Sequence, residues 1–341
     1  MKIPRYLVTG GAGFIGSNIA AALVRLGERV RVLDDLSSGC WENLAGIREP
    51  DAIELIEGDI RNESVVAEAA KGVEVIFHQA ALCSVPASVA APVTSHAINV
   101  GGTVNVLDVA RRVGVKRVIF AASSAAYGDA PVLPKHEDLR TMPLSPYAAD
   151  KLACEHYCQV FSRIYGLETL CLRYFNVFGP HQTPTGAYAA AIPRFIDAAL
   201  AGRPITLFGD GEQTRDFCYI DNVVNANLLA ANSPKKLCGE VLNVAGGRHV
   251  SLNALCDRIG LALGRKLDVV HGPAVTGDVR YSLADVSRAK EVLGFEPTVT
   301  WEEGLAPTVA YLETLAATGA SEAAQRVASM LGKNPLQMKP L

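Results

Sequence analysis

Hydrophobic positions in the first half of the chain follow two alternating patterns. Short apolar runs, typical of buried strands, are separated by stretches in which apolar residues recur every three or four positions, as in amphipathic helices. The expected strands are residues 6–8, 29–33, 53–57, 74–78, 116–122 and 168–173, and the expected helices are 19–26, 87–113 and 147–165. Strands that alternate with helices in this way predict a parallel, doubly wound sheet.

The pattern is less regular beyond residue 175. The expected helices there are 188–201, 221–232, 251–263 and 301–315, the expected strands are 205–208, 241–244 and 267–270, and the polar loops are 176–181, 209–217 and 277–280. We therefore predict an α/β chain with a large domain over 1–175 and a smaller α/β domain over 176–318, some segments of which return to the first. A loosely ordered tail is expected over 319–341.

Composition and charge exclude several classes of protein. Of 341 residues, 49% are hydrophobic and 20% are charged, which is typical of a globular chain with a substantial core. The formal net charge is -3 and no long basic run is present, so we expect neither nucleic acid nor a membrane surface as a partner. No apolar run approaches the ~18–20 residues of a membrane-spanning helix.

The N-terminus and the cysteines favour a cytoplasmic protein. The first strand begins so close to Met1 that we expect no signal peptide before it. The 8 cysteines are scattered, without a C-x-x-C motif or a His/Cys cluster at zinc spacing. We therefore expect reduced thiols and no bound metal.

A glycine-rich turn joins the first strand to the first helix. Gly10, Gly13 and Gly16 recur at every third position, which lets the backbone turn tightly and approach a ligand without a Cβ in the way. The first N–H groups of the helix, together with its dipole, favour an anion such as a diphosphate at this turn. An ordinary glycine-rich turn has the same pattern, so the residues at the other strand ends decide between the two interpretations.

Polar and small residues follow the other strands, whose carboxyl ends share one edge of a parallel sheet. Asp34 ends the second strand 24 residues after Gly10, where an acidic residue accepts both ribose hydroxyls and repels a 2′-phosphate. Asp59 follows the third strand and fits an adenine contact or an ordinary turn equally well. The small segment after the fourth strand, which lets the backbone lie against a cofactor, is Gln79, Ala80 and Ala81. These positions predict a Rossmann-like site for NAD rather than NADP.

Tyr147 and Lys151 are four residues apart in a predicted helix and therefore share a face. A Lys ammonium beside a phenol stabilises the phenolate and lowers its pKa, so Tyr147 is expected to shuttle a proton near neutral pH. Ser123 ends the fifth strand and is expected close to this pair.

Five motifs, taken in order, resemble those of the extended short-chain dehydrogenase/reductase superfamily and, within it, of the nucleotide-sugar 4-epimerases. They are T-G-G-A-G-F-I-G (9–16), A-A-S-S-A-A-Y-G (121–128), S-P-Y-A-A-D-K (145–151), R-Y-F-N-V-F-G-P (173–180) and G-D-G-E-Q-T-R-D-F (209–217). The resemblance extends from about residue 4 to about residue 315. It implies NAD-dependent 4-epimerisation of a UDP-hexose through a 4-keto sugar.

The resemblance also implies a role for each matching position. The catalytic residues are Tyr147 as base, Lys151 and Ser123. The cofactor contacts are Gly10, Gly13, Phe14, Ile15, Gly16, Asp34, Asp59, Ile60, Gln79, Ala80, Ala81, Tyr147, Lys151 and Phe175. The substrate contacts are Ser84, Ser123 with Ser124 as its alternative, Tyr147, Asn176, Arg215, Asp278 and Ser282.

Two positions of the substrate set bear on specificity. Family members restricted to UDP-glucose and UDP-galactose tend to carry Tyr where this chain has Ser282, so the small residue predicts space for an N-acetyl group and acceptance of UDP-GlcNAc and UDP-GalNAc. Ser282 could equally well fill a loop. The family often has Arg where this chain has Val275, and Arg280 is the candidate to replace its contact with the diphosphate.

Related activities remain as alternatives. A 4,6-dehydratase is the nearest rival, but it normally has an acidic pair after the Ser of its fifth strand, whereas Ser123 is followed by Ser124 and Ala125, which argues against that activity. UDP-glucuronate decarboxylases and uronate 4-epimerases share most of the motifs, and a non-catalytic NAD(H)-binding regulator is the alternative of a different class. The resemblance implies a homodimer through a four-helix bundle of residues 100–113 and 147–165, although the same apolar residues also suit burial within a monomer.

Overall fold

A seven-stranded parallel sheet forms the centre of the computed structural model, which describes residues 4–184, 190–273 and 280–317. Its strands, in spatial order, are β11 (Cys238–Val244), β6 (Glu168–Tyr174), β5 (Arg117–Ser123), β4 (Val75–His78), β1 (Tyr6–Thr9), β2 (Val30–Asp34) and β3 (Ile53–Glu57). The chain order reverses between β1 and β4, so that the carboxyl ends of these two strands flank the crevice in which such sheets bind ligands. This topology confirms the predicted doubly wound sheet.

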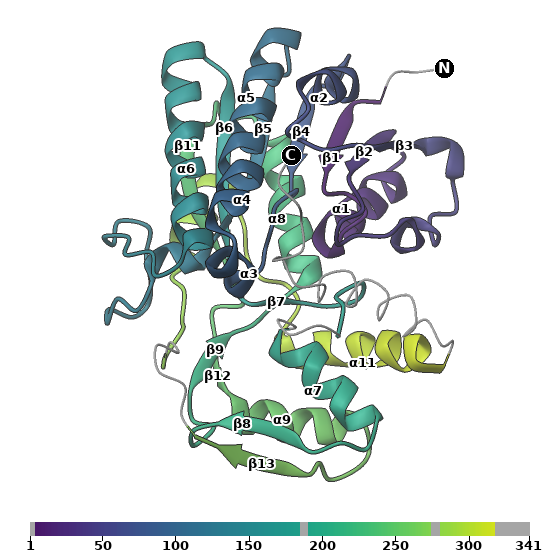
Figure 1. Cartoon of the computed structure of the whole chain (residues 1–341), viewed down its shortest axis with the longest axis vertical. Coiled ribbons are helices and arrows are strands. Elements are labelled where there is room, and N and C mark those ends of the chain that lie inside the picture. The colour runs from purple at the N-terminus through teal and green to yellow at the C-terminus, as the bar shows by residue number, and fades with distance from the viewer. Residues whose placement is uncertain (1–3, 185–189, 274–279, 318–341) are drawn as a thin grey trace.

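Helices cover both faces of the sheet, which explains why its strands are continuous apolar runs. Leu7 packs on one face with α2 (Glu63–Ala70), α5 (Gly102–Val113) and α6 (Pro146–Tyr165). The neighbouring Tyr6 and Val8 pack on the other face with α1 (Phe14–Arg25) and α8 (Ile220–Asn232). Figure 1 shows α5 and α6 lying side by side over their face of the sheet.

The single helix predicted over 87–113 is broken once, at Ala91. Before the break lies α3 (Val85–Ala90), and after it α4 (Pro92–His96), one π-helical turn (Ala97–Gly101) and α5 follow one another without leaving the helical region. Ala91 leaves the helical region with φ -139° and ψ 69°, as expected before a proline, whose ring disfavours a helical residue ahead of it. Both α3 and α4 contact the N-terminal part of α6, through Ser88 with Tyr147 and Ser95 with Asp150.

The remaining segments form a smaller part below the large sheet (Figure 1). Its helices are α7 (Ala191–Leu200), α9 (Leu252–Ala262) and α11 (Trp301–Ala317), whereas α10 (Ser287–Leu293) packs against β11 and α8 of the large sheet. Its strands pair two by two: β7 (Val177–Phe178) with β10 (Cys218–Tyr219), β8 (Ile205–Phe208) with β13 (Val269–Gly272), and β9 (Thr214–Asp216) with β12 (His249–Ser251). The predicted loop 209–217 therefore contains a strand, and β13 begins two residues later than expected. None of the described helices is long and apolar enough to cross a bilayer.

Candidate active site

The glycine turn leaves backbone donors available at the beginning of α1. A Cβ on Gly10, which has φ +66°, would lie 2.6 Å from the nitrogen of Ala80, and a Cβ on Gly16 would lie 2.1 Å from the carbonyl oxygen of Gly10. Gly13 is the N-cap of α1, with no side-chain cap and no acidic residue in the first turn. The turn is therefore a cradle, too close for side chains, in which the N–H groups near Phe14 and Ile15 can bind an anion.

The two acidic residues at the strand ends differ in their surroundings. Asp34 is 7% exposed, and its carboxylate accepts hydrogen bonds of 2.9 Å from the N–H groups of Ala12 and Leu36. Burial raises the pKa of Asp34. Asp59 instead pairs with Arg61 at 2.9 Å and accepts the Arg61 N–H at 2.7 Å, which lowers its pKa. Asp34 thus stabilises the glycine turn through its hydrogen bond with Ala12, whereas Asp59 lies in a local turn with Arg61.

The other predicted cofactor positions lie beside the same crevice. Ala80 approaches Gly10, and its N–H lies 3.4 Å from the Thr9 hydroxyl. The Gln79 side-chain oxygen, Oε1, accepts a hydrogen bond from the Tyr174 hydroxyl at 3.3 Å. The side chain of Ile60 is 5% exposed and packs under Gly102, where a Cβ would lie 2.4 Å from its Cδ1. Ala81 follows Ala80 at the end of β4 and is partly exposed.

Phe175 follows β6 and is 1% exposed. Its ring centroid lies 6.0 Å from that of Tyr127, and both rings pack with Ala245 and Ala284. Phe175 therefore forms a small apolar cluster at the end of β6.

The predicted catalytic residues converge between β5 and the beginning of α6. Tyr147 is in the first turn of α6, and its N–H donates to the Ser88 hydroxyl at 3.1 Å. Ser123 ends β5 and is hydrogen-bonded to the Tyr147 phenol. Lys151 is 3% exposed, and its ammonium donates to the Ala121 carbonyl at 2.7 Å. Ser124 begins a short 3-10 turn (Ser124–Tyr127), next to these groups in the chain.

The predicted lowering of the Tyr147 pKa is wrong for the chain alone. Burial raises the pKa of Tyr147, the nearby Cys83 thiol raises it further, and the hydrogen bond with Ser123 opposes both effects. The Lys151 ammonium lies 5.9 Å from the Tyr147 ring centroid because it points to the Ala121 carbonyl. The spacing of four residues placed Lys151 on the correct face but could not indicate where its ammonium points.

Predicted substrate residues gather around β9. Asn176, in the left-handed region with φ +29°, donates from its side chain to the Asp216 carbonyl at 3.1 Å. Arg215 is the central residue of β9, lies opposite Val250 of β12, and donates from its guanidinium to the Thr214 carbonyl at 2.9 Å. The N–H of Ser282 donates to the Thr214 carbonyl at 3.2 Å, which brings its segment against the same strand.

The side chains of two other predicted substrate residues are engaged away from β9, and two further positions cannot be placed. Ser84 caps α3 by accepting the Ala87 N–H at 3.1 Å. Arg280 is held by the carboxylate of Asp210 through two hydrogen bonds of 2.7 and 2.8 Å, and this pair lowers the pKa of Asp210 to about 2. Asp278 and Val275 lie outside the described residues.

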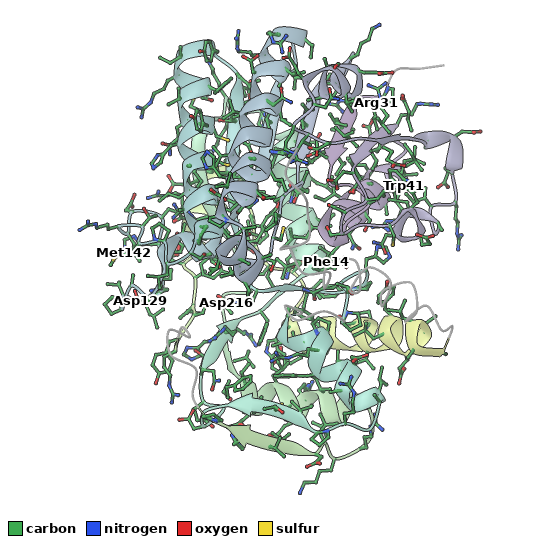
Figure 2. All side chains as sticks on the ribbon, viewed as in Figure 1. Phe14, Arg31, Trp41, Asp129, Met142 and Asp216 are labelled. Atoms are coloured by element: carbon green, nitrogen blue, oxygen red, sulfur yellow. The ribbon has the colours of Figure 1, made fainter. Side chains whose placement is uncertain are left out.

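Asp216 is a residue of this region that the sequence did not single out. It is fully buried, and its carboxylate accepts the N–H groups of Gly246 at 2.9 Å and Ala284 at 3.0 Å. Burial raises its pKa to about 6. Figure 2 shows Asp216 and Phe14 at the level where the large sheet meets the smaller part. The only local signal was its position directly after Arg215.

This arrangement suits two ligands, a dinucleotide and a second molecule, both of which would reach the Tyr147 phenol. The glycine cradle and Asp34 suit a diphosphate and a ribose, and β9 presents a guanidinium suited to another phosphate group. The described residues contain no cluster of His, Cys, Asp and Glu that could hold a metal ion.

Comparisons with known proteins find relatives that match most of the chain. The model of the NAD dependent epimerase/dehydratase family matches residues 6–245. The UDP-glucose 4-epimerase of Mycolicibacterium smegmatis is 40% identical over 309 residues, which cover 90% of this chain and 98% of that protein.

Solved structures are similar over nearly the same length. The UDP-N-acetylglucosamine 4-epimerase from Methanobrevibacter ruminantium M1, in complex with UDP-N-acetylmuramic acid, has a TM-score of 0.86 and 39% identity and covers 92% of this chain and 99% of that chain. The UDP-glucuronic acid 4-epimerase from Bacillus cereus, with UDP-glucuronic acid and NAD, has a TM-score of 0.83 and 30% identity and covers 91% and 99%.

Proposed function

Since this chain belongs to the NAD-dependent epimerase/dehydratase family and is an NAD-dependent UDP-sugar 4-epimerase, we propose that it acts on acetylated UDP-hexoses and interconverts UDP-GlcNAc and UDP-GalNAc. UDP-glucose and UDP-galactose are the secondary pair. The observation that carries this proposal is the small side chain of Ser282, on a segment that is hydrogen-bonded to β9 beside Arg215. A bulky residue at this position would occupy the volume that a 2-acetamido group needs.

The proposed binding roles follow the geometry of the two parts. The N–H groups at the beginning of α1 hold the NAD diphosphate, and Asp34 accepts the adenosine ribose hydroxyls. Arg215 and Asn176 hold the diphosphate of the UDP-sugar. Tight binding of the nucleotide leaves the hexose free to rotate between the two half-reactions. An epimerase requires this rotation.

The proposed chemistry centres on Tyr147. Its phenolate accepts the proton of the sugar C4 hydroxyl, and the same oxygen returns the proton after the sugar has turned over. Bound NAD supplies the reversible hydride acceptor for this reaction. Ser123 orients O4 through its hydroxyl, and the Lys151 ammonium stabilises the phenolate charge. Because burial favours the protonated phenol, we expect the Lys151 ammonium to move from the Ala121 carbonyl toward the phenol oxygen during the reaction.

Substrate preference can be tested by incubating the protein separately with UDP-GlcNAc, UDP-glucose and UDP-glucuronate and resolving the epimers. We expect the highest kcat/KM with UDP-GlcNAc, and a hundredfold preference for UDP-glucose would refute the proposal. Turnover of UDP-glucuronate alone would support the uronate alternative. Absence of turnover with any sugar, despite bound NAD, would favour a regulator.

Ser282→Tyr tests the pocket itself. Filling the acetamido volume should cost about 1–3 kcal/mol, or roughly 5- to 150-fold in kcat/KM for UDP-GlcNAc, and leave UDP-glucose turnover nearly unchanged. Ser287→Tyr is the matched control, because Ser287 is exposed on the same segment. Equal losses with both sugars would mean that residue 282 does not face the 2-substituent.

We also propose a homodimer through α5 and α6. These helices expose a group of apolar side chains that are 40–70% accessible: Val113, Tyr157, Val160, Ile164 and Tyr165. A large exposed apolar patch is typical of an interface. Ile164→Glu should convert the dimer to a monomer in analytical ultracentrifugation, whereas Leu261→Glu, at an equally exposed position on α9, should not. A wild-type monomer would contradict this proposal.

A further inference from the structure

Asp150 is a buried carboxylate beside the catalytic pair. It lies in the second turn of α6, between Tyr147 and Lys151 in the chain, and is 6% exposed. Burying a charged group is costly unless hydrogen bonds compensate for the lost water. Lys151 does not provide that compensation, because its ammonium donates to the Ala121 carbonyl. The partners of Asp150 therefore have to come from elsewhere.

Those partners are on the helical segment that follows the break at Ala91. Ser95 of α4 donates to Oδ2 of Asp150 at 2.6 Å. Asn99 of the π turn donates to the same oxygen at 3.4 Å. His96 lies 3.3 Å from Oδ1, with its side chain 66% exposed. The carboxylate therefore joins the catalytic turn of α6 to α4 and to the π turn.

Asn99 carries this connection onward to the loop after β4. Its side-chain oxygen accepts the Leu82 N–H at 2.8 Å, and its amide nitrogen donates to the Leu82 carbonyl at 3.3 Å. The residue that follows, Cys83, is close enough to the Tyr147 phenol to raise its pKa. These hydrogen bonds therefore link the helix that carries Tyr147 to the loop that contains Cys83.

We propose that Asp150 is a positioning residue that fixes the Tyr147 helix relative to the Leu82–Ser84 loop, and so sets the space in which the sugar ring meets the phenol. This role rests on the proposed function. One acceptor oxygen of Asp150 serves both Ser95 and Asn99, so that a change at Asp150 reaches the loop through Asn99. A second hydrogen bond, from the Tyr147 N–H to Ser88 of α3, holds the same turn at its other end. The π turn fits this role, since such turns often occur at functional sites.

Asp150→Asn tests the proposal without a change of size. The amide replaces one acceptor oxygen with a donor, which then faces Asn99 or His96, and the link to Leu82 weakens. We expect kcat to fall about 10-fold, because small displacements of a catalytic group are costly, with KM for the UDP-sugar within about twofold. NAD content and Tm should stay near the wild-type values. His96→Gln is the matched control and should keep kcat within about twofold, since this partner is mostly exposed.

Hydrogen exchange gives a readout that does not depend on turnover. In Asp150→Asn the Leu82 amide should exchange about 10-fold faster, and in His96→Gln its rate should be unchanged. An unchanged Leu82 rate together with unchanged kcat would overturn the proposal. So would a parallel loss of Tm, NAD and kcat, which would indicate a purely structural role. If the wild type turns over no UDP-sugar but Leu82 exchange still rises in Asp150→Asn, then the proposed function fails while the link from Asp150 to the loop stands.

Discussion

The two parts of this protein hold their ligands in different ways. In the large sheet, the proposed NAD contacts come mainly from backbone groups at consecutive strand ends, and a glycine turn of seven residues (10–16) supplies most of them. In the smaller part, the contacts are side chains on segments that are far apart in the chain, such as Asn176, Arg215 and Ser282, brought together by β9 and its neighbours. We therefore expect changes in the first part to act through backbone space, and changes in the second to act through single side-chain contacts.

Tyr147→Phe, at the proposed catalytic phenol, should have the largest effect. Removal of the hydroxyl abolishes the proposed proton transfer and should lower kcat by roughly 10²–10⁴-fold, because general acid–base groups contribute that much. NAD content should be unchanged, since neither the cradle nor Asp34 is altered. Epimer formation at saturating UDP-sugar is the measurement, and near-normal turnover with NAD bound would remove Tyr147 from the mechanism.

Gly16→Ala should affect the NAD side. The new Cβ would lie 2.1 Å from the Gly10 carbonyl oxygen, so the turn must open and the backbone donors must move. Overpacking of this kind costs about 1–3 kcal/mol, and we expect NAD affinity to fall by up to roughly 100-fold.

Gly46→Ala is the control for this substitution, because no atom lies within 4 Å of its added Cβ. NAD retained after gel filtration, measured by absorbance, separates the two variants. Equal retention would show that the turn tolerates a side chain and is not the cradle we describe.

The sequence predicted the first part of the molecule far better than the second. The strand ends at Asp34 and Ser123 were correct because apolar runs and local turn residues determine them. The break at Ala91 in the helix predicted over 87–113 was missed because the pattern around Pro92 is otherwise helical. β9 was missed because its sequence, Thr-Arg-Asp, is polar and its partner β12 lies more than 30 residues later.

The candidate site shows the same limit. Spacing placed Tyr147 and Lys151 together, but the direction of the ammonium and the raised pKa of Tyr147 depend on tertiary packing. Asp216 and Asp150 gave no pattern at all, because their partners are backbone and side-chain groups from distant segments. Local periodicity predicts which strands and helices exist, and long-range hydrogen bonds decide where their side chains point.

Arg215→Lys should affect the UDP-sugar side more moderately. Lysine keeps the charge but loses the planar pair of donors that matches a phosphate, so we expect KM for the UDP-sugar to rise about 10-fold with little change in kcat. Arg280→Lys should change KM by less than about twofold, because Arg280 is held by Asp210. A larger effect at residue 280 than at residue 215 would assign the diphosphate contact to Arg280 instead.

The smallest effect concerns the pH dependence of stability. Burial raises the pKa of Asp216 in the smaller part to about 6, above its ordinary value of 3.8. The folded state therefore binds this proton more tightly than the unfolded state, and the stabilisation is complete below the unfolded pKa and is lost as pH rises through about 6. In the large sheet, burial lowers the pKa of His78 to about 3, so that His78 stays neutral over the same range.

Between pH 7 and pH 6, Asp216 should add only about 0.4 kcal/mol to the free energy of unfolding. Urea unfolding of wild type and Asp216→Asn at both pH values measures this contribution as the difference between their pH dependences. Identical pH dependences in the two proteins would show that Asp216 does not titrate in this range, and the two parts would then be alike in their response to pH.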